Sequence, residues 1–233
     1  MNNFFDNYPE FYKTSITGSG VNRLNSRYSA IIENNKNIIL GSSILDIASH
    51  DGRWSFAAIK NGASQILGIE GKSHLVNSSN RNFEKYNIPS NTYNFEIGDI
   101  HKKIKLLSSN KYDVIFCFGF LYHTYQHTLL FSEMKRLNPK YIILDVRISL
   151  NENPIVELSF NDPKIEGSAI NFDTDIGKVL VGKPSKLSLE MMLEYYGFRF
   201  NYYDWKNHGI TDWDEIEDYR DGDRVSLVAT NIK

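Results

Sequence analysis

Short apolar runs alternate with amphipathic segments along most of the chain. Runs such as Ile44–Ile47, bounded by polar residues, are too short for helices and fit strands buried on both faces of a parallel sheet. Seven such runs predict strands at residues 44–47, 66–70, 93–97, 112–119, 141–148, 198–205 and 224–230. Apolar residues at helical spacing predict helices at residues 23–33, 55–60, 73–86, 100–107, 128–137 and 189–196.

The last two predicted strands differ from the others in how they are joined. Residues 206–223 between them carry no helical pattern, so the strands are expected to be antiparallel neighbours. The chain is long enough for a full core. The pattern predicts one α/β domain over residues 1–233, a Rossmann-like seven-stranded mostly parallel sheet with an antiparallel last strand and helices on both faces.

Two segments depart from this alternation. The helix at residues 23–33 either covers a sheet edge or forms a lid, in which Arg23, Arg27 or Tyr28 reaches a charged ligand. Residues 149–184 contain several turn signals, and 179–181 predict a short strand in a hairpin with 169–172. We interpret this insertion as a substrate cover, with an oligomer contact as the alternative.

The stretch from Ile44 to Gly71 carries the clearest chemical signal. Asp46 lies near the end of the first strand, and the loop that follows is small or polar, with Gly52 free of steric limits. Glu70 closes the second strand at nearly the spacing of about 20 residues at which a dinucleotide fold places its ribose-binding acid. A nucleoside site is therefore predicted, against the alternative of an ordinary α/β turn.

The loop sequence indicates which nucleoside. A dinucleotide fingerprint would read G-x-G-x-x-G, whereas the loop here is Asp46-Ile-Ala48-Ser-His50-Asp-Gly52. It resembles the first motif of class I S-adenosylmethionine-dependent methyltransferases, D/E-x-G-x-G-x-G, with Ala48 and His50 in place of two glycines. The resemblance extends over residues 40–148 and 186–230, through GIEG, GDI, YDVIFCFGFLYHT and DGDRVSLVA.

The resemblance implies S-adenosyl-L-methionine as the cofactor and a set of residues that hold it. Glu70 would bind the ribose, Asp99 the adenine amino group and the backbone of Ile100 the ring, while Asp99 could equally cap the next helix. Arg27 would reach the amino-acid tail. The remaining expected cofactor contacts are Asp46, Ala48, Ser49, His50, Gly52, Trp54, Gly71, Phe118 and Gly119.

The residues after the fourth strand are rich in proton-transfer groups. FLYHTYQHT would emerge near the reactive end of the cofactor, although each residue taken singly is more often an ordinary loop or core residue. His123 follows the strand soonest and is our candidate catalytic base in a direct in-line transfer. Asp145 and Arg147 on the fifth strand either reach the same crevice or pair with each other.

The methyl acceptor is less well indicated. FLYHT and the helix KLSLEMMLEYYGF resemble the branch of tRNA wobble-uridine carboxymethyl- and methyltransferases, a likeness that does not fix the substrate. Between Asp204 and Arg224, however, eight acids oppose three bases, which would repel RNA if that loop faced the substrate. We predict a small-molecule acceptor, with an RNA-modifying enzyme or a non-catalytic cofactor-binding protein as alternatives and a dehydrogenase as a distant fourth.

Charge and cysteine content add bounds. The net charge of −2 gives no global attraction to nucleic acid or membrane, and no run is long enough to span a bilayer. Cys117 is the single cysteine, and the N-terminus has no leader-like pattern, so a cytoplasmic protein is expected. No set of residues has metal-ligand spacing, so no metal is proposed, and the oligomeric state is left open.

Overall fold

A seven-stranded sheet forms the centre of the molecule, in a computed structural model that describes residues 3–15, 17, 20–170 and 177–232. The strand order is β3-β2-β1-β4-β5-β9-β8, in which β9 alone runs antiparallel to its neighbours. The predicted fold class is confirmed. The strands are β1 (Ser43–Ile47), β2 (Gln65–Glu70), β3 (Tyr93–Ile97), β4 (Val114–Phe118), β5 (Tyr141–Arg147), β8 (Phe198–Tyr202) and β9 (Arg224–Asn231).

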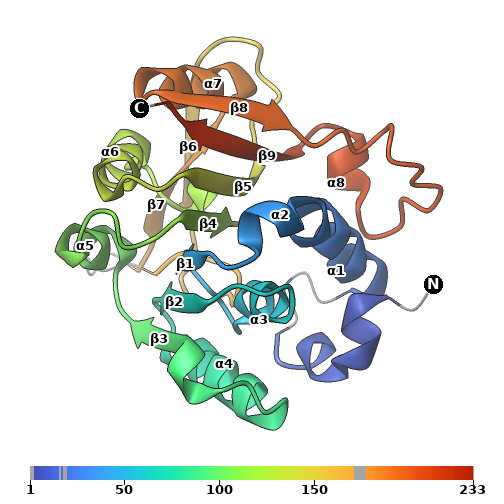
Figure 1. Cartoon of the computed structure of the whole chain (residues 1–233). Helices are drawn as coiled ribbons and strands as arrows, with labels where there is room; N and C mark the ends of the chain where they lie inside the picture. The colour runs from blue at the N-terminus through green and yellow to red at the C-terminus, as the bar shows by residue number, and fades with distance from the viewer. Residues whose placement is uncertain (1–2, 16, 18–19, 171–176, 233) are drawn as a thin grey trace.

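Helices cover both faces of this sheet (Figure 1). Residues alternate between two apolar clusters, so that Ile44 faces one and Leu45 the other. The first cluster lies under α1 (Val21–Arg27), α2 (Lys36–Ile39), α3 (Arg53–Lys60) and α4 (Ser73–Lys85). The second lies under α5 (Ile100–Lys103), α6 (His127–Leu137) and α7 (Lys186–Tyr195), while the short α8 (Glu217–Arg220) precedes β9.

The helix predicted at residues 23–33 packs on a face of the sheet. It begins as α1, continues as a π-helical turn (Tyr28–Ile32) and ends as a 3-10 turn (Glu33–Asn35). Leu24, Ile31 and Ile32 are fully buried in the first cluster, and Tyr28 stacks on Phe4 at a centroid distance of 4.1 Å. The expected cover of a sheet edge is therefore wrong, because the apolar stripe of this helix packs beside α3.

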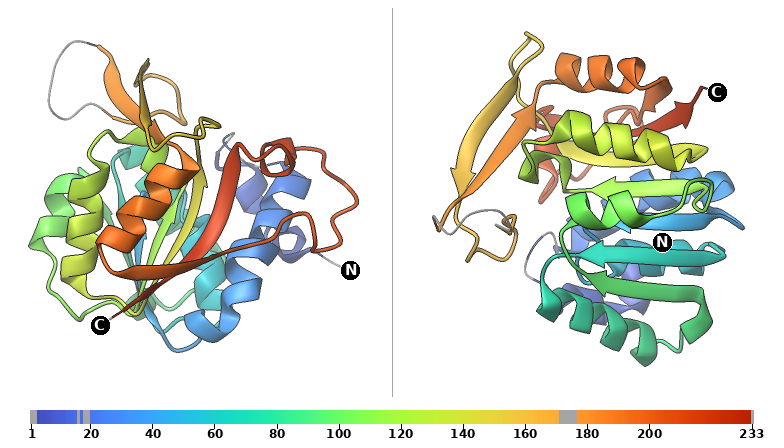
Figure 2. Two further views of the ribbon diagram at one scale, coloured as in Figure 1. Left: turned by 90° about the horizontal axis from the view of Figure 1, so that it is seen from above. Right: turned by 90° about the vertical axis from the view of Figure 1, so that its left-hand side faces the viewer.

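The insertion forms a separate two-stranded arm. β6 (Val156–Asn161) pairs antiparallel with β7 (Val179–Pro184), and the arm extends from the end of the sheet toward which the parallel strands point (Figure 2). The strand at 179–181 is confirmed, but its expected partner at 169–172 is wrong: residues 169–170 are not in a strand, and 171–172 lie outside the described residues. β7 instead pairs with six consecutive residues of β6.

A short capped helix, α5, follows β3. Asp99 caps α5 by accepting a hydrogen bond from the His101 amide at 2.9 Å, as predicted. The helix predicted at 100–107 divides into α5 and a 3-10 turn (Ile104–Leu106).

No helix in the described part of the chain combines the length and apolar character needed to cross a bilayer.

Candidate active site

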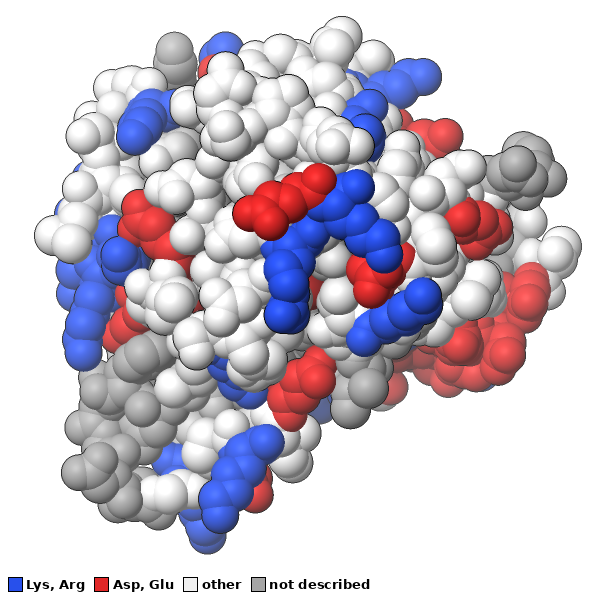
Figure 3. All heavy atoms as spheres, turned by 90° about the horizontal axis from the view of Figure 1, so that it is seen from below, with Lys and Arg blue, Asp and Glu red and all other residues white. Residues whose placement is uncertain are grey.

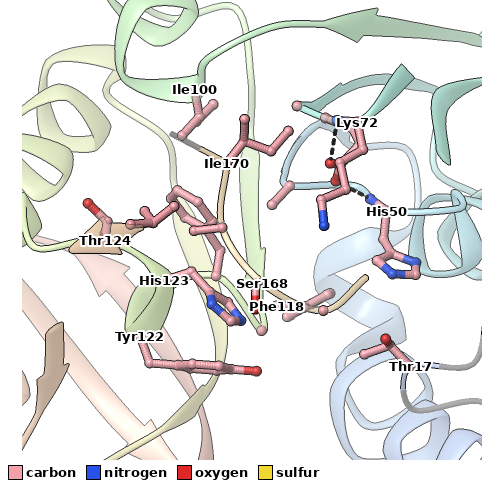
Figure 4. A pocket seen from close by; sticks show the side chains of 18 of the residues that line it. Thr17, His50, Lys72, Ile100, Phe118, Tyr122, His123, Thr124, Ser168 and Ile170 are labelled. Carbon is pink, nitrogen blue, oxygen red and sulfur yellow. Dashed lines mark hydrogen bonds between the residues drawn. The ribbon is translucent and has the colours of Figure 1, made fainter. Parts of the chain in front are cut away.

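A cavity of about 790 Å³ lies at the carboxyl ends of the parallel strands. Residues from β1, β2 and the loops after them form one wall, here called the β1–β2 side: Ala48, His50, Glu70, Gly71 and Lys72. The opposite wall, the β4–β5 side, includes Phe118, Tyr122, His123, Arg147 and Arg224. Figure 4 shows side chains of both walls pointing into the space between them.

Glu70 is fixed by the backbone at the end of β2. Its side chain is 8% exposed and lines the cavity. One carboxylate oxygen accepts a hydrogen bond from the His50 amide at 3.0 Å and the other from the Lys72 amide at 2.9 Å (Figure 4). Each oxygen keeps further acceptor capacity, so the carboxylate can accept additional hydrogen bonds.

The loop after β1 keeps a glycine-like backbone where the sequence has other residues. Ala48 and His50 have φ of 56° and 55°, and Gly52 has φ of 78°. A left-handed conformation costs a residue with a side chain about 1–2 kcal/mol, and such strain is found most often at functional sites. The two substitutions in the glycine motif therefore preserve the backbone path that the motif serves.

Most of the predicted cofactor residues reach the cavity wall. Those that line it are Arg27, Ala48, His50, Trp54, Glu70, Gly71, Asp99, Ile100, Phe118 and Gly119. Three others, Asp46, Ser49 and Gly52, lie behind the wall. A Cβ on Gly52 would lie 3.0 Å from that of Ser79, so the glycine lets the loop pack against α4.

Asp46 supports the loop from below. It is 1% exposed and accepts a hydrogen bond of 2.6 Å from Ser55 Oγ at the start of α3. Burial raises the pKa of Asp46 to about 7, and the nearby carboxylates of Glu70 and Asp51 add to the rise. Its contact is with α3, one layer away from the cavity.

His123 and Tyr122 project from the short turn after β4 (Leu121–His123), with ring centroids 4.3 Å apart. The Nδ1 atom of His123 is buried and has no hydrogen-bond partner among the described residues. Burial lowers the pKa of His123 to about 4, and the positive charges of Arg224, Lys72 and Arg147 contribute. The imidazole is therefore neutral at physiological pH.

Other residues of the FLYHTYQHT stretch either line the cavity or support its wall from outside. Tyr125 lines the cavity, whereas His127 is 3% exposed and lies outside the wall. The Nε2 atom of His127 lies 2.9 Å from the carbonyl oxygen of Leu121 and 3.0 Å from that of Gly182 in β7. His127 thus joins the turn after β4 to the arm.

A buried ion cluster supports the β4–β5 side. Asp145 is fully buried and accepts hydrogen bonds from Arg224 at 2.6 Å, Tyr219 at 2.7 Å, Ser226 at 3.0 Å and Arg27 at 3.2 Å. Burial alone would raise the pKa of Asp145, but the two arginines and Tyr219 lower it to about 2. The anticipated pairing of Asp145 with Arg147 is wrong.

Sequence reasoning assigned no role to Arg224 at the site, although it lines the cavity. Besides Asp145, it donates to Asp218 at 3.1 Å and to the Tyr122 hydroxyl at 2.9 Å. Its place on the wall follows from the pairing of β5 with β9, in which Arg147 lies opposite Arg224. A local motif carries no signal for such a pairing.

Two distant segments meet over the mouth of the cavity. Lys72 Nζ donates to the carbonyl oxygens of Ile165 and Glu166 at 2.9 and 2.7 Å, and the Glu166 carboxylate accepts from Ser15. Residues 165–170 line the cavity, as do Arg23 and Arg27 of α1. The insertion and the N-terminal helix thus both contribute to the cavity wall, whereas Tyr28 is not part of it.

The acidic loop lies outside the cavity. Residues 204–223, all of which the structure describes, contribute nothing to its wall. Asp218 pairs with Arg23 at 2.8 Å and with Arg224, so part of the negative charge serves the support of the site. Acidic side chains gather at the right edge of Figure 3, on the side where Figure 1 draws α8.

The family described as "Methyltransferase domain" matches residues 40–190, well over half of the chain and nearly all of the cavity-lining strands. The chain belongs to this methyltransferase family. The match confirms the family resemblance deduced from the loop after β1, and the enzyme class with it. The likeness to the tRNA wobble-uridine branch stays a prediction.

Solved structures share the fold of this methyltransferase. The N-terminal domain of EvdMO1, determined in the presence of SAH (S-adenosylhomocysteine) and D-fucose, has a TM-score of 0.62 at 18% identity, over 91% of this chain and 82% of that one. A putative S-adenosylmethionine-dependent methyltransferase from Listeria monocytogenes gives 0.61 at 14%, over 89% and 99%. Magnesium protoporphyrin IX methyltransferase from Synechocystis, with bound SAM, gives 0.59 at 14%, over 98% and 91%. No curated protein sequence matches the chain.

Within residues 3–15, 17, 20–170 and 177–232, no three His, Cys, Asp or Glu side chains gather as they would around a metal ion.

Proposed function

We propose that this methyltransferase transfers a methyl group from S-adenosyl-L-methionine to a small-molecule acceptor. The observation that carries the proposal is the Glu70 carboxylate, held in the cavity by two backbone amides at the end of β2. A carboxylate at this place in a parallel sheet suits the two hydroxyls of a ribose. Asp99 and Ile100, on the next loop along the sheet, would meet the adenine ring.

The cavity fits the rest of the cofactor as well. Arg27 is 7% exposed, and its Nε atom has no hydrogen-bond partner among the described residues although it is buried on the wall. An unsatisfied guanidinium nitrogen favours a carboxylate ligand, such as that of a methionine tail. Its guanidinium also lies 4.8 Å from the Trp54 ring, which limits its movement.

The bound sulfonium supplies an activated methyl group, and the protein has to align the acceptor with it. His123 is neutral and carries a nitrogen without a partner, so it can remove the acceptor proton as the new bond forms. Phe118 and Trp54 give the site an apolar wall, which keeps water from competing.

A small acceptor is favoured by residues 165–170, which line one side of the cavity. Lys72 donates to the carbonyl oxygens of residues 165 and 166 and so ties this segment to the β1–β2 side, which suits a ligand that enters whole. Among the similar structures, one was determined with D-fucose and another is a magnesium protoporphyrin IX methyltransferase. Those ligands belong to those proteins, but they support the same class of acceptor here.

Three measurements test the proposal. Titration calorimetry with SAH should give saturable binding, and SAH but not NAD should raise the melting temperature. Incubation of a cell extract with methyl-labelled S-adenosylmethionine should then place the label in the small-molecule fraction. Label in RNA, with strongly salt-dependent RNA binding, would instead identify an RNA-modifying enzyme. SAH binding without any labelled product would indicate a non-catalytic protein.

A further inference from the structure

Two arginines face each other across the strands of the β4–β5 side. Arg147 ends β5 and lies directly opposite Arg224 of β9. Like charges at such a pair destabilise a sheet unless something neutralises them. Arg224 is neutralised by Asp145 and Asp218, whereas Arg147 has neither an ion pair nor a hydrogen bond with any described residue.

Arg147 is placed to receive a ligand. It is exposed as a residue, yet it lines the cavity. Its charge and that of Arg224 act on His123 from the same wall, and that of Lys72 acts from the β1–β2 side. The positive charge of the β4–β5 side thus lies near the point where we place the methyl acceptor.

The acids of the cavity do not offset this charge. The three acids that line it are Glu70, Asp99 and Glu166. Glu70 and Asp99 belong to the β1–β2 side and its neighbouring loop, and Glu166 accepts a hydrogen bond from Ser15 at the mouth. The β4–β5 side is left with a guanidinium that lacks a counterion among the described residues.

We propose that the β4–β5 side is an oxyanion subsite, in which Arg147 binds a carboxylate or phosphate group of the acceptor. This inference rests on the proposed function. The oxyanion is a separate group from the atom that is methylated, because the latter has to lie at His123. The guanidinium fork suits either anion, since both present two oxygens in one plane.

The subsite can be probed without knowing the acceptor. SAH-saturated protein is titrated by calorimetry with inorganic phosphate, benzoate and the neutral analogue benzamide. We expect at least one of the two anions to bind at least about tenfold more tightly than benzamide, and the stronger of the two identifies the group. Equal binding of benzoate and benzamide without phosphate binding, or no binding of either anion, would overturn the subsite.

Variants assign the effect to Arg147. Arg147→Gln should abolish the preference for the anion and Arg147→Lys should restore part of it, because a lysine keeps the charge but loses the fork. Arg199→Gln is the matched control, since Arg199 is exposed on β8 and lies outside the cavity wall. An unchanged preference in Arg147→Gln would contradict the proposal.

The failure of the subsite and that of the proposed function give different results. SAH affinity is measured for every variant and should stay within about twofold of the wild type; wild-type protein that does not bind SAH would refute the proposed function itself. In the labelled extract, the product should be retained on an anion exchanger at pH 8. A labelled product that passes unretained would overturn the subsite while leaving the methyltransferase assignment intact.

Discussion

The two walls of the cavity are built in different ways. The β1–β2 side comes from one short stretch, in which backbone amides of residues 50 and 72 hold Glu70. The β4–β5 side takes its side chains from α1, the turn after β4, β5 and β9, and a buried carboxylate holds them together. The first wall depends on local backbone geometry and suits a cofactor shared by a family. The second depends on distant side chains, which a single protein can adapt to its own acceptor.

Replacing the candidate base on the β4–β5 side should have the largest effect. The change should appear in turnover and not in cofactor affinity. We expect His123→Ala to lower turnover by about 10²–10⁴-fold, the usual contribution of a positioned base. SAH affinity, measured by calorimetry, should stay within about twofold. His208→Ala is the control, because His208 lies outside the cavity wall and packs on Tyr203. Unchanged turnover with the labelled acceptor would remove His123 from the mechanism.

The support of the same wall should control stability. Asp145→Asn leaves Arg27 and Arg224 buried without their shared counterion, so the free energy of unfolding should fall by about 3–5 kcal/mol. Urea denaturation measures the change. Asp221→Asn breaks an ion pair with Arg220 in which both side chains are about half exposed and screened by solvent, so it should change the free energy of unfolding little. Equal losses in the two variants would show that the cluster contributes no special stability.

On the β1–β2 side, the effect should appear in cofactor affinity. Glu70→Gln places an amide donor against one of the two backbone donors, and it removes the charge offered to the ribose. We expect SAH to bind about 10–100-fold more weakly, as hydrogen bonds to charged groups contribute about 1.5–3 kcal/mol. Glu96→Gln, which alters a carboxylate paired with Lys103 outside the cavity, is the control. If both variants bind SAH alike, Glu70 does not hold the ribose.

The smallest effect should be a pH dependence from beneath the β1–β2 side. The pKa of Asp46 is raised from its model-compound value of 3.8 to about 7, so its contribution to stability is present below pH 4 and is lost as pH rises through 7. From pH 6 to 8 the wild type should therefore lose about 1.4 kcal/mol of stability relative to Asp46→Asn, because the folded state releases its proton over this window while the unfolded state is already ionised.

Urea unfolding of both proteins at the two pH values checks this difference. Asp113→Asn serves as the control, because an ion pair with Lys140 and a backbone hydrogen bond lower the pKa of Asp113, which titrates well below this window. A parallel pH response of wild type and Asp46→Asn would mean that Asp46 remains ionised at neutral pH.

The same division explains what the sequence could predict. The seven strands, their alternation with helices and the position of Glu70 are local signals, since each is carried by a few consecutive residues. Ala48 and His50 adopt the left-handed backbone that glycine favours, so the loop keeps the same path although two glycines of the motif are replaced. A contiguous pattern therefore identified the β1–β2 side.

Contacts between distant segments were beyond the same reasoning. The role of Arg224 depends on the register of β5 with β9, and β7 pairs with β6 from the start of the insertion. Whether a residue lines the cavity or lies behind its wall also depends on distant segments. Asp46 and Gly52 belong to the loop identified from the sequence, but they pack against α3 and α4.

The position of β9 has a consequence for how the protein is made. β9 follows β8 in the chain but lies between β5 and β8 in the sheet. Until the ribosome has synthesised β9, one edge of β5 is unpaired, and Asp145 lacks the hydrogen bonds that Tyr219 and Arg224 donate to it. The β1–β2 side can thus form early in synthesis, whereas the β4–β5 side is completed by residues translated about eighty codons after β5 begins.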